Sequence, residues 1–229
     1  MADRSSIFDM IGPIMIGPSS SHTGGVARIG RAARHLFGRQ PEEVVITFFN
    51  SFARTYEGHG SDKAVIAGLL DMEPDDERLK NSLALSREAG MNFQMKAVTN
   101  ASAMHPNTVK ILMKAEGQEM WVRGVSRGGG IIGIVEIDGF KCNFSAAAPT
   151  LLVTAHDIHG SVAFISSVVA HDECNIATMT VNRRGKADIA KLVFELDSGI
   201  RPLTLDYLRS LNWISDVTYL ELREDAAAG

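Results

Sequence analysis

The last third of the chain constrains the fold more tightly than any other part of the sequence. After position 150, apolar periodicity and turn residues alternate between the strand repeat and the helix repeat. The expected elements are a strand at 151–155, a helix at 160–172, strands at 174–182 and 188–197 joined by a hairpin turn at 184–186, a helix at 202–211 and a strand at 215–222. This β-α-β-β-α-β order is the split βαβ arrangement of ferredoxin-like domains, for which about 70 residues suffice. We therefore expect a separate domain over 150–224.

The first two thirds of the chain predict a larger α+β domain over 1–148. Its expected helices lie at 23–37, 61–72 and 77–89, and its expected strands at 44–49, 93–98, 108–115, 119–127, 130–138 and 140–145. The uneven alternation of these elements indicates one mixed or antiparallel sheet. The boundary is expected at Ala147-Ala148-Pro149, because the residue before a proline is disfavoured in a helix.

Charge and cysteine content exclude several classes of protein. A net charge of -4 and a pI of about 6.0 argue against a nucleic-acid binder, which is usually basic. The sequence has no long apolar run for a membrane span and no signal peptide, because its N-terminus is polar. Two cysteines, Cys142 and Cys174, are too few for a Cys₄ zinc site or for an iron–sulfur cluster. We expect a cytoplasmic protein with no metal ligands of its own.

An acidic run surrounds Pro74 and comprises Asp71, Glu73, Asp75, Asp76 and Glu77. It lacks the glycine turn and regular spacing of calcium loops, which favours a solvated loop between helices. His35 lies near a helix C-terminus, where it would offset the helix dipole. The histidines at 156, 159 and 171 have no carboxylate or thiolate at matching spacing, so a surface or interface role is expected for them.

The most informative segment is 16–25, Ile-Gly-Pro-Ser-Ser-Ser-His-Thr-Gly-Gly, which leads into an amphipathic helix. The first N–H groups of a helix lack internal partners and carry partial positive charge, so they suit a carboxylate or phosphate. The hydroxyls of this segment belong to Ser19, Ser20, Ser21 and Thr23. His22 adds a group that changes protonation near neutral pH. Simple N-capping by Ser or Thr is an equally good explanation of the hydroxyls alone.

Two shorter segments carry further histidines. In Gly58-His59-Gly60-Ser61-Asp62 the glycines are expected to expose the His59 ring, Ser61 can cap the next helix, and Asp62 suits its first turn. The second segment, His105-Pro106-Asn107, lies between two expected strands and is explained equally well as an ordinary turn. Two histidines in Gly/Ser loops, each just before a helix, are stronger evidence together than either alone.

Glycines at 128, 130 and 133 match the spacing G-x-G-x-x-G. A dinucleotide-binding fingerprint needs a helix directly after the glycines, whereas Ile131-Ile132-Gly133-Ile134-Val135 is typical of a strand. We therefore reject a nucleotide site here and expect a β-bulge or a close approach of a ligand to the backbone.

Together these motifs resemble the β chain of bacterial iron–sulfur-dependent L-serine dehydratases, over almost the whole chain. The Ser-Ser-Ser-His-Thr segment is the specific part of the resemblance, and Gly58–Asp62 and His105–Asn107 support it. The family implies an N-terminal domain similar to the allosteric substrate-binding domain of some phosphoglycerate dehydrogenases. It also implies a C-terminal ACT domain, a small-molecule sensor. Segment 157–162 lies where ACT domains pass from the first strand to the first helix, with His159 in place of a frequent proline.

The resemblance implies β-elimination of water from L-serine, with release of pyruvate and ammonia. It also implies a [4Fe-4S] cluster ligated by a partner α chain, because this chain lacks the thiolates. His22 and His59 would reach into the α-chain site, with His59 favoured as the base that takes the Cα proton. Ser19, Ser20, Ser21 and Thr23 would hold the substrate carboxylate, with Asp62, His105 and Asn107 as further candidates for substrate binding.

The ACT resemblance implies an amino-acid site near His159, Gly160 and Ser161, with L-serine as the expected effector, and pairing of two copies through this domain or the N-terminal one. Two other functions stay open at this point. The chain would be a non-catalytic amino-acid-binding regulator if the loops bind a small acid without chemistry. It would be a metal-dependent hydrolase if Asp62 or His105 joined His22 and His59 as a third ligand.

Overall fold

The computed structural model describes residues 15–101 and 103–222. By contacts within the chain it divides into two compact units after Asp138. The sequence places the boundary later, at Pro149, so the strand Phe140–Phe144 is grouped with the second unit.

The first sheet is mixed and has the strand order β2-β1-β3-β4-β5-β6, in which every strand except β6 belongs to the first unit. Its strands are β1 (Glu43–Phe49), β2 (Asn92–Val98), β3 (Thr108–Ala115), β4 (Gln118–Gly128), β5 (Ile131–Ile137) and β6 (Phe140–Phe144). Strand β1 pairs in parallel with β2, whereas the pairs β1–β3, β3–β4 and β4–β5 are antiparallel. Of the two kinds of sheet that the sequence predicted, mixed or antiparallel, the structure has the mixed one, and its strands start and end within a residue or two of their predicted positions.

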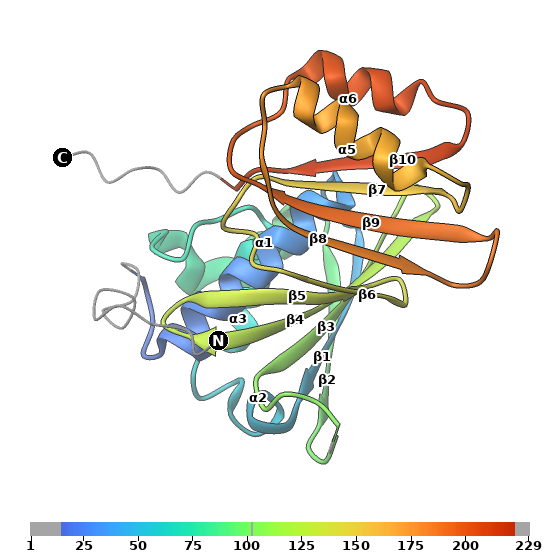
Figure 1. Cartoon of the computed structure of the whole chain (residues 1–229). Coiled ribbons are helices and arrows are strands. Elements are labelled where there is room, and N and C mark those ends of the chain that lie inside the picture. The colour runs from blue at the N-terminus through green and yellow to red at the C-terminus, as the bar shows by residue number, and fades with distance from the viewer. Residues whose placement is uncertain (1–14, 102, 223–229) are drawn as a thin grey trace. The chain divides into compact units, whose positions relative to one another are not determined.

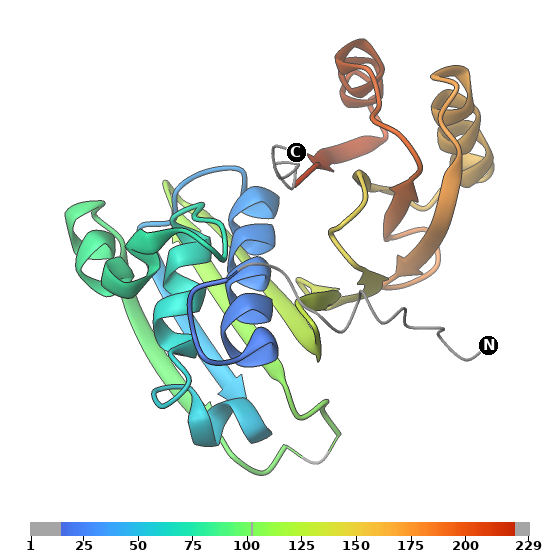
Figure 2. The ribbon, with the colours of Figure 1, turned by 90° about the vertical axis from the view of Figure 1, so that its left-hand side faces the viewer.

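Two helices cover one face of this sheet, α1 (Gly25–Phe37) against the strands and α3 (Ser61–Leu69) beside it (Figure 2). Their backbones approach each other so closely that glycine is required on both. A Cβ on Gly68 would lie 2.1 Å from the carbonyl oxygen of Ala27, and a Cβ on Gly30 would lie 2.5 Å from that of Val65. The Val26, Ile29 and Ala33 side chains of α1 are buried, as the amphipathic pattern predicts.

The helices differ in detail from their predicted ranges. A π-helical turn, η1 (Ser20–Gly24), precedes α1, so the helical segment begins earlier than predicted. Helix α3 ends at Leu69, and Asp71 two residues later is left-handed with φ of 63°, which prevents continuation to residue 72. The predicted helix at 77–89 is two elements, the 3₁₀ helix η2 (Glu77–Asn81) and α4 (Ser82–Glu88). The short helix α2 (Asn50–Thr55) was not predicted.

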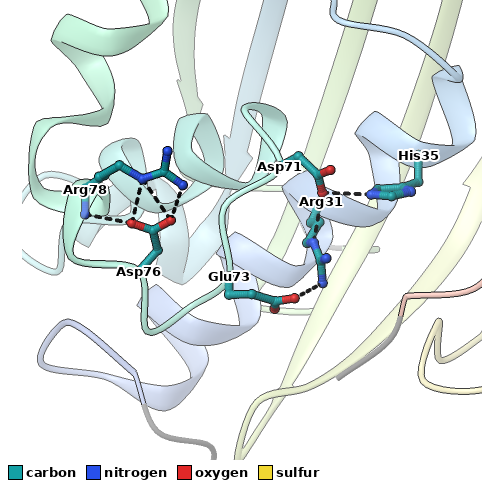
Figure 3. A network of polar contacts seen from close by, with 6 residues as sticks. All are labelled: Arg31, His35, Asp71, Glu73, Asp76 and Arg78. Carbon is teal, nitrogen blue, oxygen red and sulfur yellow. Dashed lines mark hydrogen bonds and ion pairs between the residues drawn. The ribbon is translucent and has the colours of Figure 1, made fainter. Parts of the chain in front are cut away.

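The acidic run is more structured than the solvated loop that we expected (Figure 3). Arg31 of α1 donates to Asp71 at 2.9 Å and pairs with Glu73, and His35 lies 2.7 Å from the same Asp71 oxygen. Burial alone would raise the pKa of Asp71, but the hydrogen bonds from His35 and Arg31 lower it overall. His35 lies in the last turn of α1, as predicted, and its ring also contacts a carboxylate beyond the end of α3.

In the same run Asp76 accepts from the backbone and guanidinium of Arg78 and so caps η2 (Figure 3). Among the described residues no group of three or more His, Cys, Asp or Glu side chains is placed to hold a metal ion.

The second unit has the predicted β-α-β-β-α-β order, shown in yellow to red in Figure 1. Its elements are β7 (Thr150–His156), α5 (Ser161–His171), β8 (Ile176–Arg183), β9 (Ile189–Leu196), α6 (Pro202–Arg209) and β10 (Ile214–Leu220), with the sheet order β10-β7-β9-β8. Both helices lie on one face of this sheet (Figure 1), and the core between them contains Leu151, Ile165, Phe194 and Leu208. No helix in the described part of the chain is both long enough and apolar enough to span a membrane.

Candidate active site

Two of the predicted motifs meet in the structure through a reciprocal pair of hydrogen bonds. The Thr23 hydroxyl donates to the carbonyl oxygen of His59 at 2.9 Å, and the Ser61 hydroxyl donates to that of His22 at 2.6 Å. Thr23 and Ser61 are both buried. They therefore hold the loop before α1 against the loop before α3, and this arrangement places His22 beside His59.

The local backbone explains why the first loop folds in this way. Gly17 has φ of 135°, and a Cβ there would lie 2.5 Å from the Thr23 side chain, so the loop closes only with glycine at this position. Ser19 is the N-cap of η1, and its hydroxyl accepts from the backbone N–H of His22 at 3.1 Å. The capping role that the sequence left open is thus real, but it belongs to Ser19 alone.

The His22 ring is surrounded by hydroxyl groups. The Ser21 Oγ lies 3.0 Å and the Ser19 Oγ 3.4 Å from Nδ1, while the Ser51 Oγ lies 3.5 Å from Nε2. A hydroxyl can donate or accept, so this set accommodates either neutral tautomer of the imidazole. The edge of Phe52 packs on the same ring, with ring centroids 4.9 Å apart.

His22 and His59 form a pair, with ring centroids 4.9 Å apart and ring planes tilted by 47°. Burial lowers the pKa of His22, and the neighbouring His59 lowers it further. Two imidazoles this close disfavour the protonated form of His22. The His22 ring is therefore held neutral, which is the form that accepts a proton.

The second loop differs from prediction at its junction with α3. Gly60 is left-handed with φ of 67° and is the N-cap, whereas Ser61 is the first helical residue and makes no cap. The ring of His59 is only partly exposed, so the flanking glycines do not leave it open to the extent that we expected. Asp62 lies in the first turn of α3 as predicted, and its Oδ1 is buried with no hydrogen-bond partner among the described residues.

The third motif, His105-Pro106-Asn107, is joined to the neighbourhood of the site by backbone hydrogen bonds. The carbonyl of Pro106 accepts from the Ser51 N–H at 3.0 Å, and the carbonyl of Asn107 accepts from the Ser126 N–H, also at 3.0 Å. The Asn107 N–H donates to Nδ1 of His105 at 3.1 Å, and His105 is exposed. The motif thus packs against Ser51, which touches His22, but no direct contact of His105 or Asn107 with His22 occurs among the described residues.

Sequence reasoning missed Asn50, Ser51 and Phe52. They follow the buried strand β1 directly, where the chain reverses at Asn50 with φ of 52°. Asparagine tolerates this left-handed conformation better than most residues. An Asn-Ser pair at the end of a buried strand was the available indication of a functional turn.

The glycine-rich segment continues into a strand, as predicted, and not into the helix that a dinucleotide fingerprint needs. Strand β4 runs to Gly128, the pairing with β5 shifts register between Ser126 and Gly128, and β5 follows in place of a helix. This register shift lies where the sequence predicts a β-bulge, and Gly128, Gly129 and Gly130 all have positive φ.

The thiols of this chain do not fit an iron–sulfur cluster. Cys142 and Cys174 are both buried, and the Cys174 thiol donates to the carbonyl of Ser198 at 3.2 Å. A four-iron cluster needs three or four thiolates that point to one place. This chain alone therefore does not supply the thiolates of such a cluster.

The predicted sensor segment forms the start of α5. Gly160 is the left-handed N-cap with φ of 80°, and Ser161 is the buried first residue of the helix. His159 and Gly160 are exposed. The exposed cap places a polar ring at the start of an 11-residue helix.

Comparison with known proteins finds relatives that share one description. Residues 6–136 match the family model "Serine dehydratase beta chain". The chain is 44% identical to "Probable L-serine dehydratase, beta chain" of Bacillus subtilis over 93% of this chain and 96% of that one, and 37% identical to "L-serine dehydratase, beta chain" of Peptoniphilus asaccharolyticus over 89% and 90%. A solved ACT domain from the GTP pyrophosphokinase of Chlorobium tepidum is 18% identical, with a TM-score of 0.27, and covers 31% of this chain and 95% of that one. The chain belongs to the serine dehydratase beta chain family.

Proposed function

We propose that this chain is the β subunit of a cytoplasmic iron–sulfur L-serine dehydratase, a serine ammonia-lyase that is active only with an α chain. L-Serine loses water by β-elimination, and the aminoacrylate product hydrolyses to pyruvate and ammonia. Family membership supports the reaction, and the paired imidazoles of His22 and His59 are the observation that supports a role in proton transfer. The α chain would carry the [4Fe-4S] cluster, which supplies Lewis-acid assistance to the leaving hydroxyl.

The residues of this chain handle the proton. The Cα proton of serine is weakly acidic, so its removal needs a neutral base within hydrogen-bond reach. His59 is proposed as that base, because among the described residues its ring nitrogens make no side-chain hydrogen bond, while those of His22 face hydroxyls. His22, kept neutral by burial and by His59, keeps the pair able to accept one proton.

The hydroxyl residues of the first loop have different roles. The Ser19 and Ser21 hydroxyls lie on Nδ1 of His22 and so orient that ring, and the buried Thr23 joins the two loops. Ser20 carries no comparable contact among the described residues and is the serine of the three best placed to meet a substrate carboxylate. Asp62, His105 and Asn107 are proposed as supporting groups around the pair.

A sensing role for the second unit rests on its βαββαβ order and its exposed helix start. L-Serine is the proposed effector at His159, Gly160 and Ser161, since a helix N-terminus favours a carboxylate. Pairing of two copies through this unit or the first one completes the proposal. Calorimetry of the intact chain with L-serine tests it, and absence of heat with serine and other amino acids would remove an independent sensor site.

Reconstitution tests the main proposal. The purified chain is mixed anaerobically with a cluster-loaded α chain, and pyruvate formation from L-serine is followed. We expect activity only in the mixture, because the base and the Lewis acid lie on different chains. Full activity of the β chain alone, or no gain on mixing despite complex formation, would contradict the proposal. The second outcome would favour a non-catalytic regulator that binds a small acid through the same loops.

A further inference from the structure

A groove of about 400 Å³ lies between α2 and the segments at 99–101 and 104–106. Asn50 fixes its walls. The side-chain amide donates to the carbonyls of Ala101 at 3.0 Å and Met104 at 3.2 Å, and its oxygen accepts from the Ala101 N–H at 2.9 Å. The Asn50 side chain therefore forms its hydrogen bonds with the backbone that lines the groove, and the groove does not depend on a ligand for its shape.

The groove has a positive character. Of the described residues that line it, Arg54 alone carries a charge, and Ser51, Thr99 and Asn100 add neutral polar groups. Arg54 is exposed, and within residues 15–101 and 103–222 its guanidinium makes one hydrogen bond, to the Thr99 carbonyl at 3.3 Å. Its remaining N–H groups form the planar fork that matches a carboxylate.

The groove is also connected to the catalytic pair. Ser51 lines it and lies 3.5 Å from Nε2 of His22. Ser51 and Arg54 are three positions apart on one short helix, so they project from the same side of it. A small molecule held by Arg54 is therefore within about one helical turn of the Ser51–His22 contact.

We propose that this groove is a binding site for the carboxylate of a small amino acid or 2-oxo acid, with Arg54 as its anion-binding residue. Its volume is near the lower limit for ligand pockets, which suits a compact molecule. The identification of that acid as the substrate or product of the enzyme rests on the proposed function. The site itself rests on the charge, the fixed walls and the contact with His22.

The test follows the His22 ring resonances by NMR while the intact chain is titrated with L-serine, pyruvate or L-serinamide, which lacks the carboxylate. We expect saturable shifts at His22 with the carboxylates at millimolar concentration and none with the amide. Arg54→Gln is expected to weaken binding about tenfold or more, and Arg54→Lys to keep part of it because the charge remains. Arg87→Gln, which changes an exposed arginine of α4, should bind like the wild type. Shifts with L-serine but not with pyruvate would identify a substrate site, and shifts with pyruvate but not with L-serine would identify a product site.

Two results would overturn the site: equal binding by Arg54→Gln and wild type in chains with unchanged melting temperature, or equal binding of L-serinamide and L-serine. Reconstitution with the α chain separates this failure from failure of the proposed function. If the wild type is active and Arg54→Gln changes neither the KM for serine nor the inhibition by pyruvate, the groove is wrong and the enzyme assignment stands. If the carboxylates still shift His22 but no dehydratase activity appears, the groove stands and the assignment fails.

Discussion

The imidazole ring of His22 lies 4.9 Å from that of His59, centroid to centroid, although the two residues belong to loops that precede different helices. The buried hydroxyls of Thr23 and Ser61 hold the loops together by donating to the backbone of the opposite loop. The distance between the rings is thus fixed by backbone contacts and does not depend on the rings attracting each other.

The first prediction concerns the protonation of His22. Burial and the neighbouring His59 lower its pKa from 6.5, so an NMR titration of the ring should show a midpoint below that value. In His59→Gln the midpoint should rise but stay below 6.5, because burial is the larger cause. An unchanged midpoint in the variant would show that the two rings do not interact electrostatically.

The same shift sets the sign of a stability effect. The folded chain binds fewer protons at His22 than the unfolded chain does, so this contribution to stability is complete above pH 6.5 and is lost as the pH falls through the folded pKa. Urea unfolding of the wild type and of His22→Gln across this range measures it. The free energy of unfolding of the wild type relative to that of His22→Gln should decrease as the pH falls.

The second prediction assigns the base. His59→Ala in the assembled enzyme should lower kcat by about 10²–10⁴-fold, the usual contribution of a positioned general base. Assembly and cluster content should not change, because the Thr23 hydrogen bond is to the backbone carbonyl at 59 and survives the substitution. His171→Ala, an exposed histidine at the end of α5, is the matched control. Turnover of His59→Ala like that of the wild type would end the assignment.

The sequence predicted the elements of this fold better than their connections. Strand β3 has the predicted bounds because its apolar run ends at turn residues on both sides. Helix α2 escaped notice because six residues are too few to show a helical period. The π-turn η1 was not predictable either, since its residues are held by hydrogen bonds to the loop before α3, which are tertiary contacts.

The sequence singled out the two histidines of the candidate site but not the geometry around them. The Ser-Ser-Ser-His-Thr and Gly-His-Gly-Ser-Asp segments pointed to His22 and His59, and the structure places these two together. Ser51 and Arg54 gave no comparable pattern, because what matters about them is their position in space beside segments at 99–106. Spacing along the chain carries no information on such a contact.

The third prediction concerns the ion pairs between α1 and the end of α3. The pKa of Asp71 is lowered overall by His35 and Arg31, so its stabilising contribution is present above its ordinary value of 3.8 and is lost as the pH falls through the folded pKa. The Asp71 side chain is 47% exposed, so solvent weakens the effect. Asp71→Asn should cost about 0.2–1 kcal/mol at pH 7, and the cost should fall in high salt and near pH 3. Urea unfolding measures it, and a cost that does not change with salt would indicate lost packing instead.

The last prediction tests the close approach of α1 and α3, on which the placement of both histidine loops depends. Alanine normally stabilises a helix interior relative to glycine by up to about 1 kcal/mol, so helix propensity alone predicts a gain for Gly68→Ala. The added Cβ would instead lie 2.1 Å from the Ala27 carbonyl oxygen and 2.6 Å from the Arg31 nitrogen, both backbone atoms that cannot rotate away. The helices must separate, and we expect a net loss of about 1–3 kcal/mol in the free energy of unfolding. Gly58→Ala is the control, since its nearest contact would be 3.8 Å away and its φ is ordinary. If Gly68→Ala proves as stable as this control, the helices do not pack as closely as described here.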